Sequence, residues 1–255
     1  MRLPVAGLAL GLAPLLVGCG TAAAPAPADS VSGTVVVFAA ASLTEAFAQV
    51  GTDFHARHHG ASVEFNFAGS PTLVTQLTQG AQADVFAAAD QPNPDRVTAA
   101  GLAAAPPRVF ATNRLEIVVE AGNPKHLRGL ADLARPGLIV VLAGPTVPAG
   151  RYAAQALEAA GVRLTPASRE TDVKFVVSKV ALGEADAGIV YVTDVSAGGD
   201  RVAGVPVPDQ YNVVARYPVV RLRSAAGPVA AEAFIDYLLG PDGQRTLRRF
   251  GFTAP

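Results

Sequence analysis

The sequence Thr34–Phe47, TVVVFAAASLTEAF, changes its hydrophobic pattern halfway along. Its first half, Thr34–Ala40, is a short run of β-branched and small apolar residues, which is typical of a buried strand. From Leu43 to Phe54 the apolar residues recur at the spacing of one helix face, and Gly60 follows as a helix stop. The stretch therefore predicts a buried strand that passes directly into a helix.

The same order of strand and helix continues along the chain. Apolar residues alternate with polar ones in Ser62–Ala68, which predicts a second strand. Ser70 and Pro71 begin a second helix, and Asp84–Ala88 predicts a third strand. Strands that alternate with helices in this way favour a parallel sheet with crossover helices.

A second set of elements follows the break at residues 122–124, Gly-Asn-Pro. The long strand Arg114–Glu120 links the two sets, and Asn212–Leu222 predicts a later strand that Pro218 places at an edge or a bend. Between these two strands we expect strands at 138–142 and 187–191 and helices at 149–160 and 172–182. Two helices, at 229–239 and 242–250, end the chain.

These elements predict an α/β protein of two lobes, each with a mixed, mostly parallel sheet flanked by helices. We expect the first lobe to comprise residues 33–111 and 216–255 and the second lobe to comprise residues 112–215. The chain then crosses between the lobes twice.

The composition excludes several classes of protein. Of the 255 residues, 50% are hydrophobic and 16% are charged, which is too apolar for a disordered chain. The formal net charge of −1 lacks the basic excess of a nucleic-acid-binding face, so we expect no nucleic-acid partner. The single cysteine excludes an intramolecular disulfide and a cysteine-based zinc site.

The first 32 residues predict an export signal and a membrane anchor. Residues 1–18 have a basic start and an apolar run that is too short for a transmembrane helix, as in a signal peptide. Residues 16–19, Leu-Val-Gly-Cys, resemble the lipobox of bacterial lipoproteins, in which the cysteine is lipidated. Residues 19–32 then form an Ala/Pro-rich tether from the lipidated Cys19. An ordinary signal peptide is the alternative; the lipobox predicts an extracytoplasmic protein anchored to the cell membrane.

Serines follow two neighbouring predicted strands. Ser42 and Glu45 have the spacing of a capping box, and Ser70 stands before Pro71 as an N-cap. Open α/β sheets bind ligands at the carboxyl ends of their strands, and helix N-termini suit anions. The two serines are thus candidates for an anion site; the alternative is that they only cap their helices.

The second lobe offers a matching set of donors. Ala149 and Val173 stand at the starts of two predicted helices, where backbone N–H groups lack intrahelical partners. Tyr191 ends a predicted strand, and its hydroxyl is a further donor. The alternative for Tyr191 is a tyrosine at the edge of the core.

Metal binding and nucleophilic catalysis have fewer candidate residues in the sequence than anion binding. His55, His58 and His59 have a spacing that could hold zinc, but a solvated helix end explains them as well. An enzyme with Ser42 or Ser70 as nucleophile would lack a base, because no histidine lies near a predicted strand end. We therefore expect no catalytic activity and no bound metal cation, and the paired serines disfavour a structural or adhesive domain.

Several segments of the chain, from about Val35 to Thr253, resemble the bacterial molybdate-binding proteins of ABC uptake systems. The segments occur in the same order as in that family. They are Val37–Phe47, Phe67–Leu73, Gly80–Asp90, Val147–Ala153, Gly188–Tyr191, Tyr217–Val219 and Arg249–Thr253. Two positions depart from the family's usual serines, Gly69 and Pro71; the loss of these hydroxyls should leave the donors of the site intact and bears on the choice of anion.

The resemblance implies a two-lobe periplasmic-binding-protein fold of type II that closes on an oxyanion without any cofactor. In such proteins neutral donors alone hold the anion. Carried over to this chain, the ligands are the hydroxyls and N–H groups of Ser42 and Ser70, the N–H groups of Ala149 and Val173, and the hydroxyl of Tyr191.

The expected function is capture of molybdate, and of tungstate, for delivery to an ABC permease with its ATPase, by a monomer that closes about a hinge. Molybdate and tungstate carry no proton at neutral pH and need donors only, whereas phosphate carries a proton and profits from a carboxylate acceptor. Sulfate must be rejected by its size. The alternative is a binding protein for another oxyanion, such as sulfate or phosphate, or for a metal ion.

Overall fold

The structure is a computed structural model that describes Leu3 and residues 31–255. Apart from Leu3, the expected signal peptide lies outside the described residues, as do Cys19 and nearly all of the tether. No helix within the described part of the chain has the length and apolar character needed to cross a membrane.

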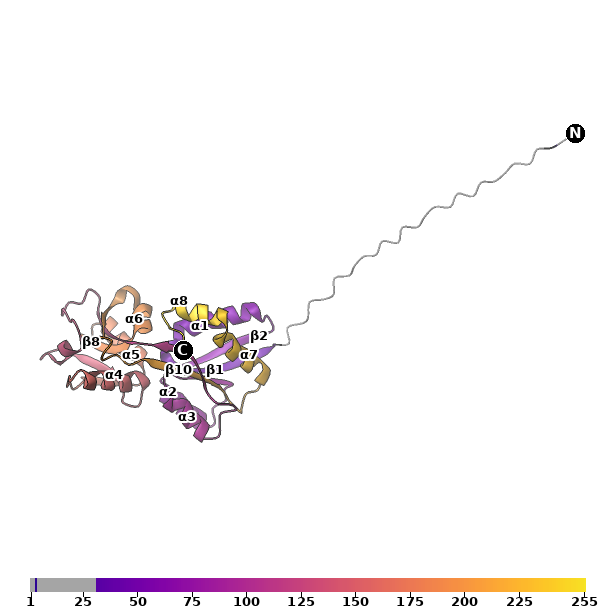
Figure 1. Ribbon diagram of the computed structural model, residues 1–255, viewed down its shortest axis with the longest axis horizontal. Helices are drawn as coiled ribbons and strands as arrows, with labels where there is room; N and C mark the ends of the chain where they lie inside the picture. Colours follow the sequence, from indigo (N-terminus) through magenta and orange to yellow (C-terminus); the bar gives the residue numbers. More distant parts are fainter. Residues whose placement is uncertain (1–2, 4–30) are drawn as a thin grey trace.

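The folded chain contains two mixed sheets of five strands, one in each lobe (Figure 1). In the first sheet the order is β2-β1-β3-β10-β4; β1 is parallel to β2 and β3, and β10 is antiparallel to both its neighbours. The strands of this sheet are β1 (Gly33–Ala40), β2 (Ala61–Ala68), β3 (Val85–Ala87), β4 (Arg108–Asn113) and β10 (Ala215–Arg221).

The second sheet repeats this arrangement. Its order is β7-β6-β8-β5-β9, with β6 parallel to β7 and β8, and β5 antiparallel to β8 and β9. Its strands are β5 (Leu115–Glu120), β6 (Val140–Ala143), β7 (Ser168–Glu170), β8 (Ala187–Tyr191) and β9 (Val202–Pro206).

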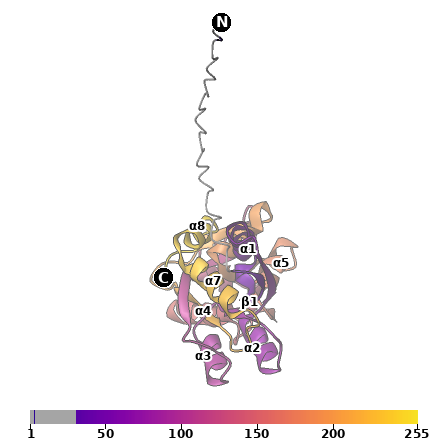
Figure 2. The same cartoon turned by 90° about the vertical axis from the view of Figure 1, so that its right-hand side faces the viewer.

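Helices cover both faces of the first sheet, as the end-on view in Figure 2 shows. Helices α1 (Thr44–Arg57), α7 (Pro228–Leu239) and α8 (Pro241–Arg249) pack on one face, and α2 (Ser70–Thr78) and α3 (Pro92–Ala99) pack on the other. The second sheet is covered by α4 (Pro148–Ala159), α5 (Val173–Ala181) and α6 (Val192–Gly198). Three short 3₁₀ helices join these elements, η1 (Ala41–Leu43), η2 (Leu130–Ala134) and η3 (Gly199–Arg201).

The larger core of the first lobe is built around Phe47 of α1. Its ring lies 5.8 Å from that of Phe65, 5.7 Å from that of Phe110 and 6.1 Å from that of Phe234. Phe47 therefore joins the helix that follows β1 to two strands and to α7, and burial of these large side chains stabilises the base on which the start of α1 rests.

The chain passes between the lobes with short connections. β4 runs almost directly into β5, and β9 leads back to β10. The C-terminal segment lies against this hinge, because the N–H of Thr253 donates to the carbonyl of Thr112 at 3.0 Å and the N–H of Thr112 donates to the carbonyl of Thr253 at 2.8 Å.

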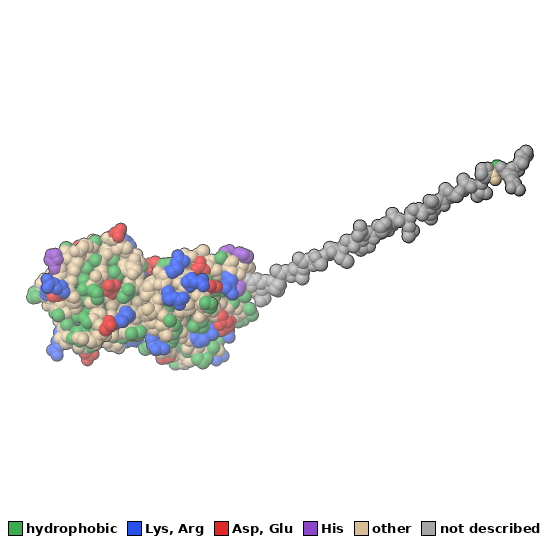
Figure 3. Space-filling view, turned by 45° about the horizontal axis from the view of Figure 1, so that its top comes forward, with side chains coloured by type: hydrophobic (Ala, Val, Ile, Leu, Met, Phe, Trp, Pro, Cys, Tyr) green, Lys and Arg blue, Asp and Glu red, His purple; other side chains and the backbone are tan. Residues whose placement is uncertain are grey.

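Acidic and basic side chains are interspersed on the molecular face seen in Figure 3.

Pro218 was predicted to place its strand at an edge or a bend, and the structure shows the bend. Its strand, β10, lies in the interior of the first sheet between β3 and β4, and not at an edge. The pairing with β4 shifts register between Tyr217 and Pro218, which is the predicted bend. A proline has no N–H for the ladder, and the register shift places it where none is needed.

Candidate anion-binding site

Ser42 lies at the end of β1, in the turn of 3₁₀ helix that leads into α1. Its side chain is buried, and its Oγ lies 3.0 Å from the hydroxyl of Tyr217. The predicted capping box is wrong: α1 has no side-chain cap, the Thr44 hydroxyl donates to the carbonyl of Ala41 at 2.7 Å, and Glu45 bonds Lys174 instead. The short 3₁₀ turn satisfies the helix start and leaves the Ser42 hydroxyl for other partners.

Ser70 is the first residue of α2, directly after β2. The prediction that Ser70 caps this helix is also wrong, because Gly69 occupies the N-cap position and no side-chain cap is formed. The Oγ of Ser70 instead accepts a hydrogen bond from the N–H of Ala89 at 3.3 Å. Because that bond uses a lone pair, the hydroxyl proton of Ser70 remains available to a ligand.

Ala149 is the second residue of α4, after Pro148. The next residue, Gly150, fixes its position: a Cβ at Gly150 would lie 2.2 Å from the carbonyl oxygen of Gly144 and 2.3 Å from that of Ala143. The start of α4 therefore packs directly on the end of β6, and only glycine allows this approach. The N–H of Ala149 is among the first N–H groups of the helix, which have no intrahelical acceptor.

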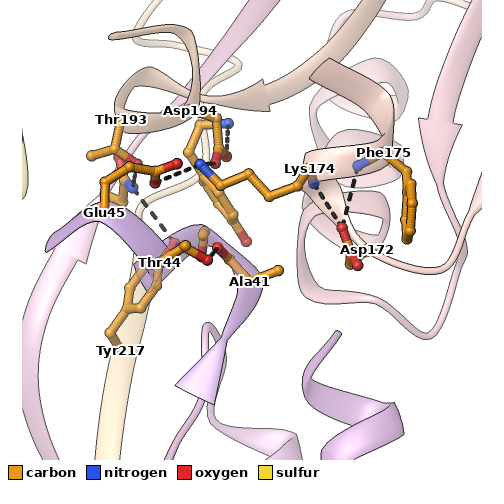
Figure 4. Close-up of polar contacts among 12 residues, drawn as sticks. Ala41, Thr44, Glu45, Asp172, Lys174, Phe175, Thr193, Asp194 and Tyr217 are labelled. Atoms are coloured by element: carbon orange, nitrogen blue, oxygen red, sulfur yellow. Dashed lines mark hydrogen bonds and ion pairs between the residues drawn. The ribbon is translucent and has the colours of Figure 1, made fainter. Parts of the chain in front are cut away.

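Val173 begins α5, and the residue before it, Asp172, is the N-cap. The Asp172 carboxylate accepts from the N–H of Lys174 at 2.8 Å and from that of Phe175 at 3.3 Å (Figure 4). Burial raises the pKa of the Asp172 carboxyl, against the effect of these two bonds. The Asp172 cap thus accepts from two of the first N–H groups of α5, and the N–H of Val173 is not one of them.

Tyr191 is the last residue of β8 and has 1% of its surface exposed. Within the part of the chain that the structure describes, its hydroxyl has no hydrogen-bond partner. Burial raises the pKa of Tyr191 well above its ordinary value, so the hydroxyl keeps its proton. A buried donor without a partner is costly, and the group is thus available to a ligand in the cleft.

These five predicted residues line one small, partly open cavity between the lobes, with room of about 10 Å³ for the centre of a water-sized sphere. That is about the room of one water molecule, so the cavity suits a small ion and no larger ligand. The N-terminal ends of α2, α4 and α5 all supply residues to its wall, and each contributes the positive end of a helix dipole. The full lining is Ala40, Ala41, Ser42, Gly69, Ser70, Ala89, Val147, Pro148, Ala149, Asp172, Val173 and Tyr191.

Sequence reasoning missed that Asp172 belongs to this lining. Its position directly before a predicted helix indicated a helix cap. Whether Asp172 also lies at the cavity depends on how the two lobes meet, which local sequence does not show. With one carboxylate in the lining, the cavity is not made of neutral groups alone, although the carboxylate is engaged as a helix cap.

The cations near the cavity are paired with carboxylates. Lys174 reaches from α5 across the cleft, with its Nζ 2.7 Å from Glu45 of the first lobe and 3.2 Å from Asp194 of its own lobe (Figure 4). Burial lowers the pKa of Lys174, but the two carboxylates outweigh that effect and raise it. Arg151 of α4 makes a second cross-lobe ion pair, at 2.7 Å, with the fully buried Asp90.

The lobes are therefore in contact through two ion pairs, as in a closed binding protein. Gly69 shows how closely they meet, because a Cβ at this residue would lie 2.4 Å from the carbonyl oxygen of Thr171 in the second lobe. The departure at Gly69 from the family's usual serine thus permits a close approach of the two lobes.

The histidines lie away from the cavity. The Nδ1 of His55 lies 2.6 Å from the carbonyl oxygen of Ala61, and the ring of His58 packs on Phe54 at 4.9 Å. Among the described residues no group of three or more His, Cys, Asp or Glu side chains has an arrangement that could hold a metal ion. No histidine is among the residues that line the cavity.

Two mixed sheets joined by two short crossings, with an anion-sized cavity between them, define a two-lobe binding protein. The sequence matches the family described as bacterial extracellular solute-binding proteins over residues 35–253, and the chain belongs to that family. It is 45% identical to the molybdate-binding protein ModA of Mycobacterium tuberculosis over 94% of this chain and 93% of that protein. It is 33% identical to ModA of Escherichia coli over 87% of this chain and 89% of that protein.

Solved structures share the fold. The periplasmic molybdate-binding protein of Azotobacter vinelandii matches with a TM-score of 0.74 at 22% identity, over 87% of this chain and 99% of that one. The sulfate-binding protein SubI of Mycobacterium tuberculosis matches with a TM-score of 0.76 at 21% identity, over 87% of this chain and 86% of that one. At these identities the two matches confirm the predicted two-lobe fold and do not discriminate between anions.

Proposed function

We propose that the protein captures molybdate, and the similar dianion tungstate, by closing its two lobes around the anion. The relatives support this ligand, since ModA of Mycobacterium tuberculosis is a molybdate-binding protein and is 45% identical to the chain over 243 residues. The proposed ligand groups are the hydroxyls and N–H groups of Ser42 and Ser70, the N–H groups of Ala149 and Val173, and the hydroxyl of Tyr191.

The observation on which the proposal depends most is the buried Tyr191 hydroxyl, which has no partner among the described residues. Tyr191 lines the cavity, which has three helix N-termini in its wall. Donors of this kind suit a tetrahedral dianion that carries no proton. The one carboxylate in the lining, Asp172, already accepts from two N–H groups of α5, which supports a capping role for it rather than a role as acceptor for a protonated anion.

The proposal extends to where the protein works. The expected signal peptide and lipobox support a location outside the cytoplasm, with an anchor through Cys19 to the cell membrane. The proposal for this location is a monomer that delivers the anion to an ABC permease. Membership of the extracellular solute-binding proteins supports the extracytoplasmic place.

We also propose that binding involves no catalysis. Ser42 and Ser70 are the hydroxyl nucleophiles that sequence reasoning considered, and neither is hydrogen-bonded to a base among the described residues. Ser42 is bonded to Tyr217, and Ser70 accepts from a backbone N–H. Activation of a serine requires a base within hydrogen-bond reach.

A calorimetric titration of the purified protein with molybdate, tungstate, sulfate and phosphate in separate experiments tests the ligand. We expect heat from the first two anions and none from the others. Heat from sulfate or phosphate, without heat from molybdate, would contradict the proposal and assign the same cavity to another oxyanion.

The anchor has its own test. Replacing Cys19 by serine removes the only thiol of the chain, and we expect the protein to move from the membrane fraction to the soluble fraction. The variant Ser32→Ala, in the same tether, is the control and should remain in the membrane fraction. Retention of the Cys19→Ser protein on membranes would show that Cys19 is not lipidated.

A further inference from the structure

We propose that Tyr217, a buried residue behind the cavity wall, fixes the direction of the hydrogen bond at Ser42 and so makes the Ser42 hydroxyl a donor to the anion. Tyr217 lies on β10 and is not part of the lining (Figure 4). The inference rests on the proposed function, because it concerns how the same site selects its ligand.

The argument begins at Asn113, the last residue of β4. Its Oδ1 accepts from the N–H of Arg114 at 2.9 Å, and this bond fixes the orientation of the side-chain amide. Its Nδ2 therefore faces the other way, where it donates to the hydroxyl of Thr193 at 2.8 Å and to the hydroxyl of Tyr217 at 3.5 Å. An amide nitrogen only donates, so the Tyr217 oxygen faces a donor on this side.

The Tyr217 hydroxyl has one proton to give. Since Asn113 presents N–H groups, the acceptor left for that proton is the Oγ of Ser42, 3.0 Å away. Tyr217 is fully buried, and burial is the main cause that raises its pKa, so the phenol keeps its proton. Ser42 and Asn113 are buried as well, and solvent does not compete for these bonds.

The consequence concerns the proton of Ser42. With a lone pair of its Oγ bonded to Tyr217, the hydroxyl directs its own proton elsewhere, and Ser42 is one of the residues that line the cavity. Ser42 then donates to a fully ionised oxyanion. A protonated oxyanion needs an acceptor for its proton, and a Ser42 hydroxyl that donates toward the anion offers none on that side. Tyr217 is thus a positioning residue that favours unprotonated anions.

A double-mutant cycle tests this role. We would titrate sodium molybdate into the purified protein and into the variants Ser42→Ala, Tyr217→Phe and the double variant. Without the Tyr217 hydroxyl, Ser42 is free to turn its proton away from the anion, so we expect the dissociation constant to rise about tenfold. In the Ser42→Ala background the same change should have no effect, because Tyr217 acts through Ser42.

Selectivity provides a second readout that a purely structural role would not move. In the Tyr217→Phe variant the Ser42 oxygen is able to accept, so the ratio of phosphate affinity to molybdate affinity should rise relative to the unsubstituted protein. Tyr237→Phe, which removes a half-buried hydroxyl from α7 of the same lobe, is the matched control and should leave both constants unchanged.

The outcomes separate the inference from the proposed function. Equal weakening in both backgrounds, or no weakening in either, would overturn the inference while molybdate binding by the unsubstituted protein stands. Absence of molybdate binding in the unsubstituted protein would overturn the proposed function and the inference with it. If Tyr217→Phe fails to fold, Asn113→Asp replaces it in the cycle, since it keeps the ring and offers Tyr217 an acceptor. Its added charge acts in both backgrounds and cancels.

Discussion

Tyr191 shows at the scale of one residue how a group is kept for a ligand. Its ring packs at 5.9 Å from that of Tyr217, while its hydroxyl has no partner among the described residues. Packing therefore holds the ring in place without using the polar atom, which is the arrangement expected of a preorganised donor.

The variant Tyr191→Phe removes this donor and leaves the ring. We expect the affinity for molybdate to fall by about 1–3 kcal/mol, the cost of leaving a buried charge short of one hydrogen bond. The thermal stability of the anion-free protein should be unchanged or slightly higher, since no bond within the described chain is lost. Calorimetry and thermal unfolding of the variant, beside Tyr211→Phe as control, measure both effects; unchanged affinity would remove Tyr191 from the site.

Asp194 is a second residue with a measurable consequence. Burial raises the pKa of its carboxyl to about 6, and the ion pair with Lys174 opposes that shift only in part. Because the folded-state pKa lies above the unfolded value of 3.8, the folded protein holds this proton to higher pH. The contribution of Asp194 to stability is therefore most favourable below pH 4 and falls as pH rises to about 6, by up to about 3 kcal/mol.

The variant Asp194→Asn has no such proton to lose. We expect its free energy of unfolding, relative to that of the unsubstituted protein, to increase between pH 4 and pH 6.5. Urea unfolding at several pH values measures the difference, and Asp200→Asn, which removes an exposed carboxylate of the same lobe, controls for the change in charge. A difference that is constant with pH would place the Asp194 carboxyl in a more polar environment than its burial indicates.

At the scale of elements, the helix starts of α1, α4 and α5 near the cavity are each set differently. A 3₁₀ turn leads into α1, the Asp172 carboxylate caps α5, and direct contact with β6 fixes the start of α4. Serine spacing alone predicted caps at Ser42 and Ser70, and both predictions were wrong. Local sequence identifies a helix start, but the bonds at that start depend on neighbours far along the chain.

The start of α4 gives the test at this scale. In Gly150→Ala the added methyl group would lie 2.2 Å from the carbonyl of Gly144, so the helix must move away from β6. We expect a loss of stability of about 1–3 kcal/mol, typical of overpacking, and a clear loss of molybdate affinity because the N–H of Ala149 moves with the helix. Gly129→Ala, at a glycine with open space around its Cβ position, is the control in both measurements.

At the scale of the whole molecule, the closed form depends on contacts between lobes. Lys174 with Glu45 and Arg151 with Asp90 are ion pairs across the cleft, and Gly69 meets the backbone of Thr171. Asp90 is fully buried in this form, where it accepts from the N–H and the Nδ2 of Asn93 in its own lobe and from Arg151 across the cleft. Closure thus gives this buried carboxylate a charged partner from the other lobe.

The variant Gly69→Ala adds a methyl group at the contact between lobes. It should prevent the closest approach, because the added Cβ would lie 2.4 Å from the carbonyl of Thr171. We expect molybdate affinity to fall about tenfold, with little change in the stability of either lobe, since the clash exists only when the lobes meet. Small-angle scattering with and without molybdate measures the closure. An equally compact anion-bound form and an equal affinity would show that the lobes adjust without cost.

The sequence by itself determined the class of fold and the set of candidate donors. Hydrophobic periodicity predicted most strands and helices, since burial acts on neighbours at fixed spacings, and five residues at strand ends or helix starts predicted one cavity. Short elements with weak patterns were missed, such as β7 and β9. Only the tertiary structure decided that β10 is an interior strand, that Asp172 borders the cavity, and that Tyr217 stands behind Ser42. These features depend on contacts between residues more than a hundred positions apart, and local spacing contains no information about such contacts.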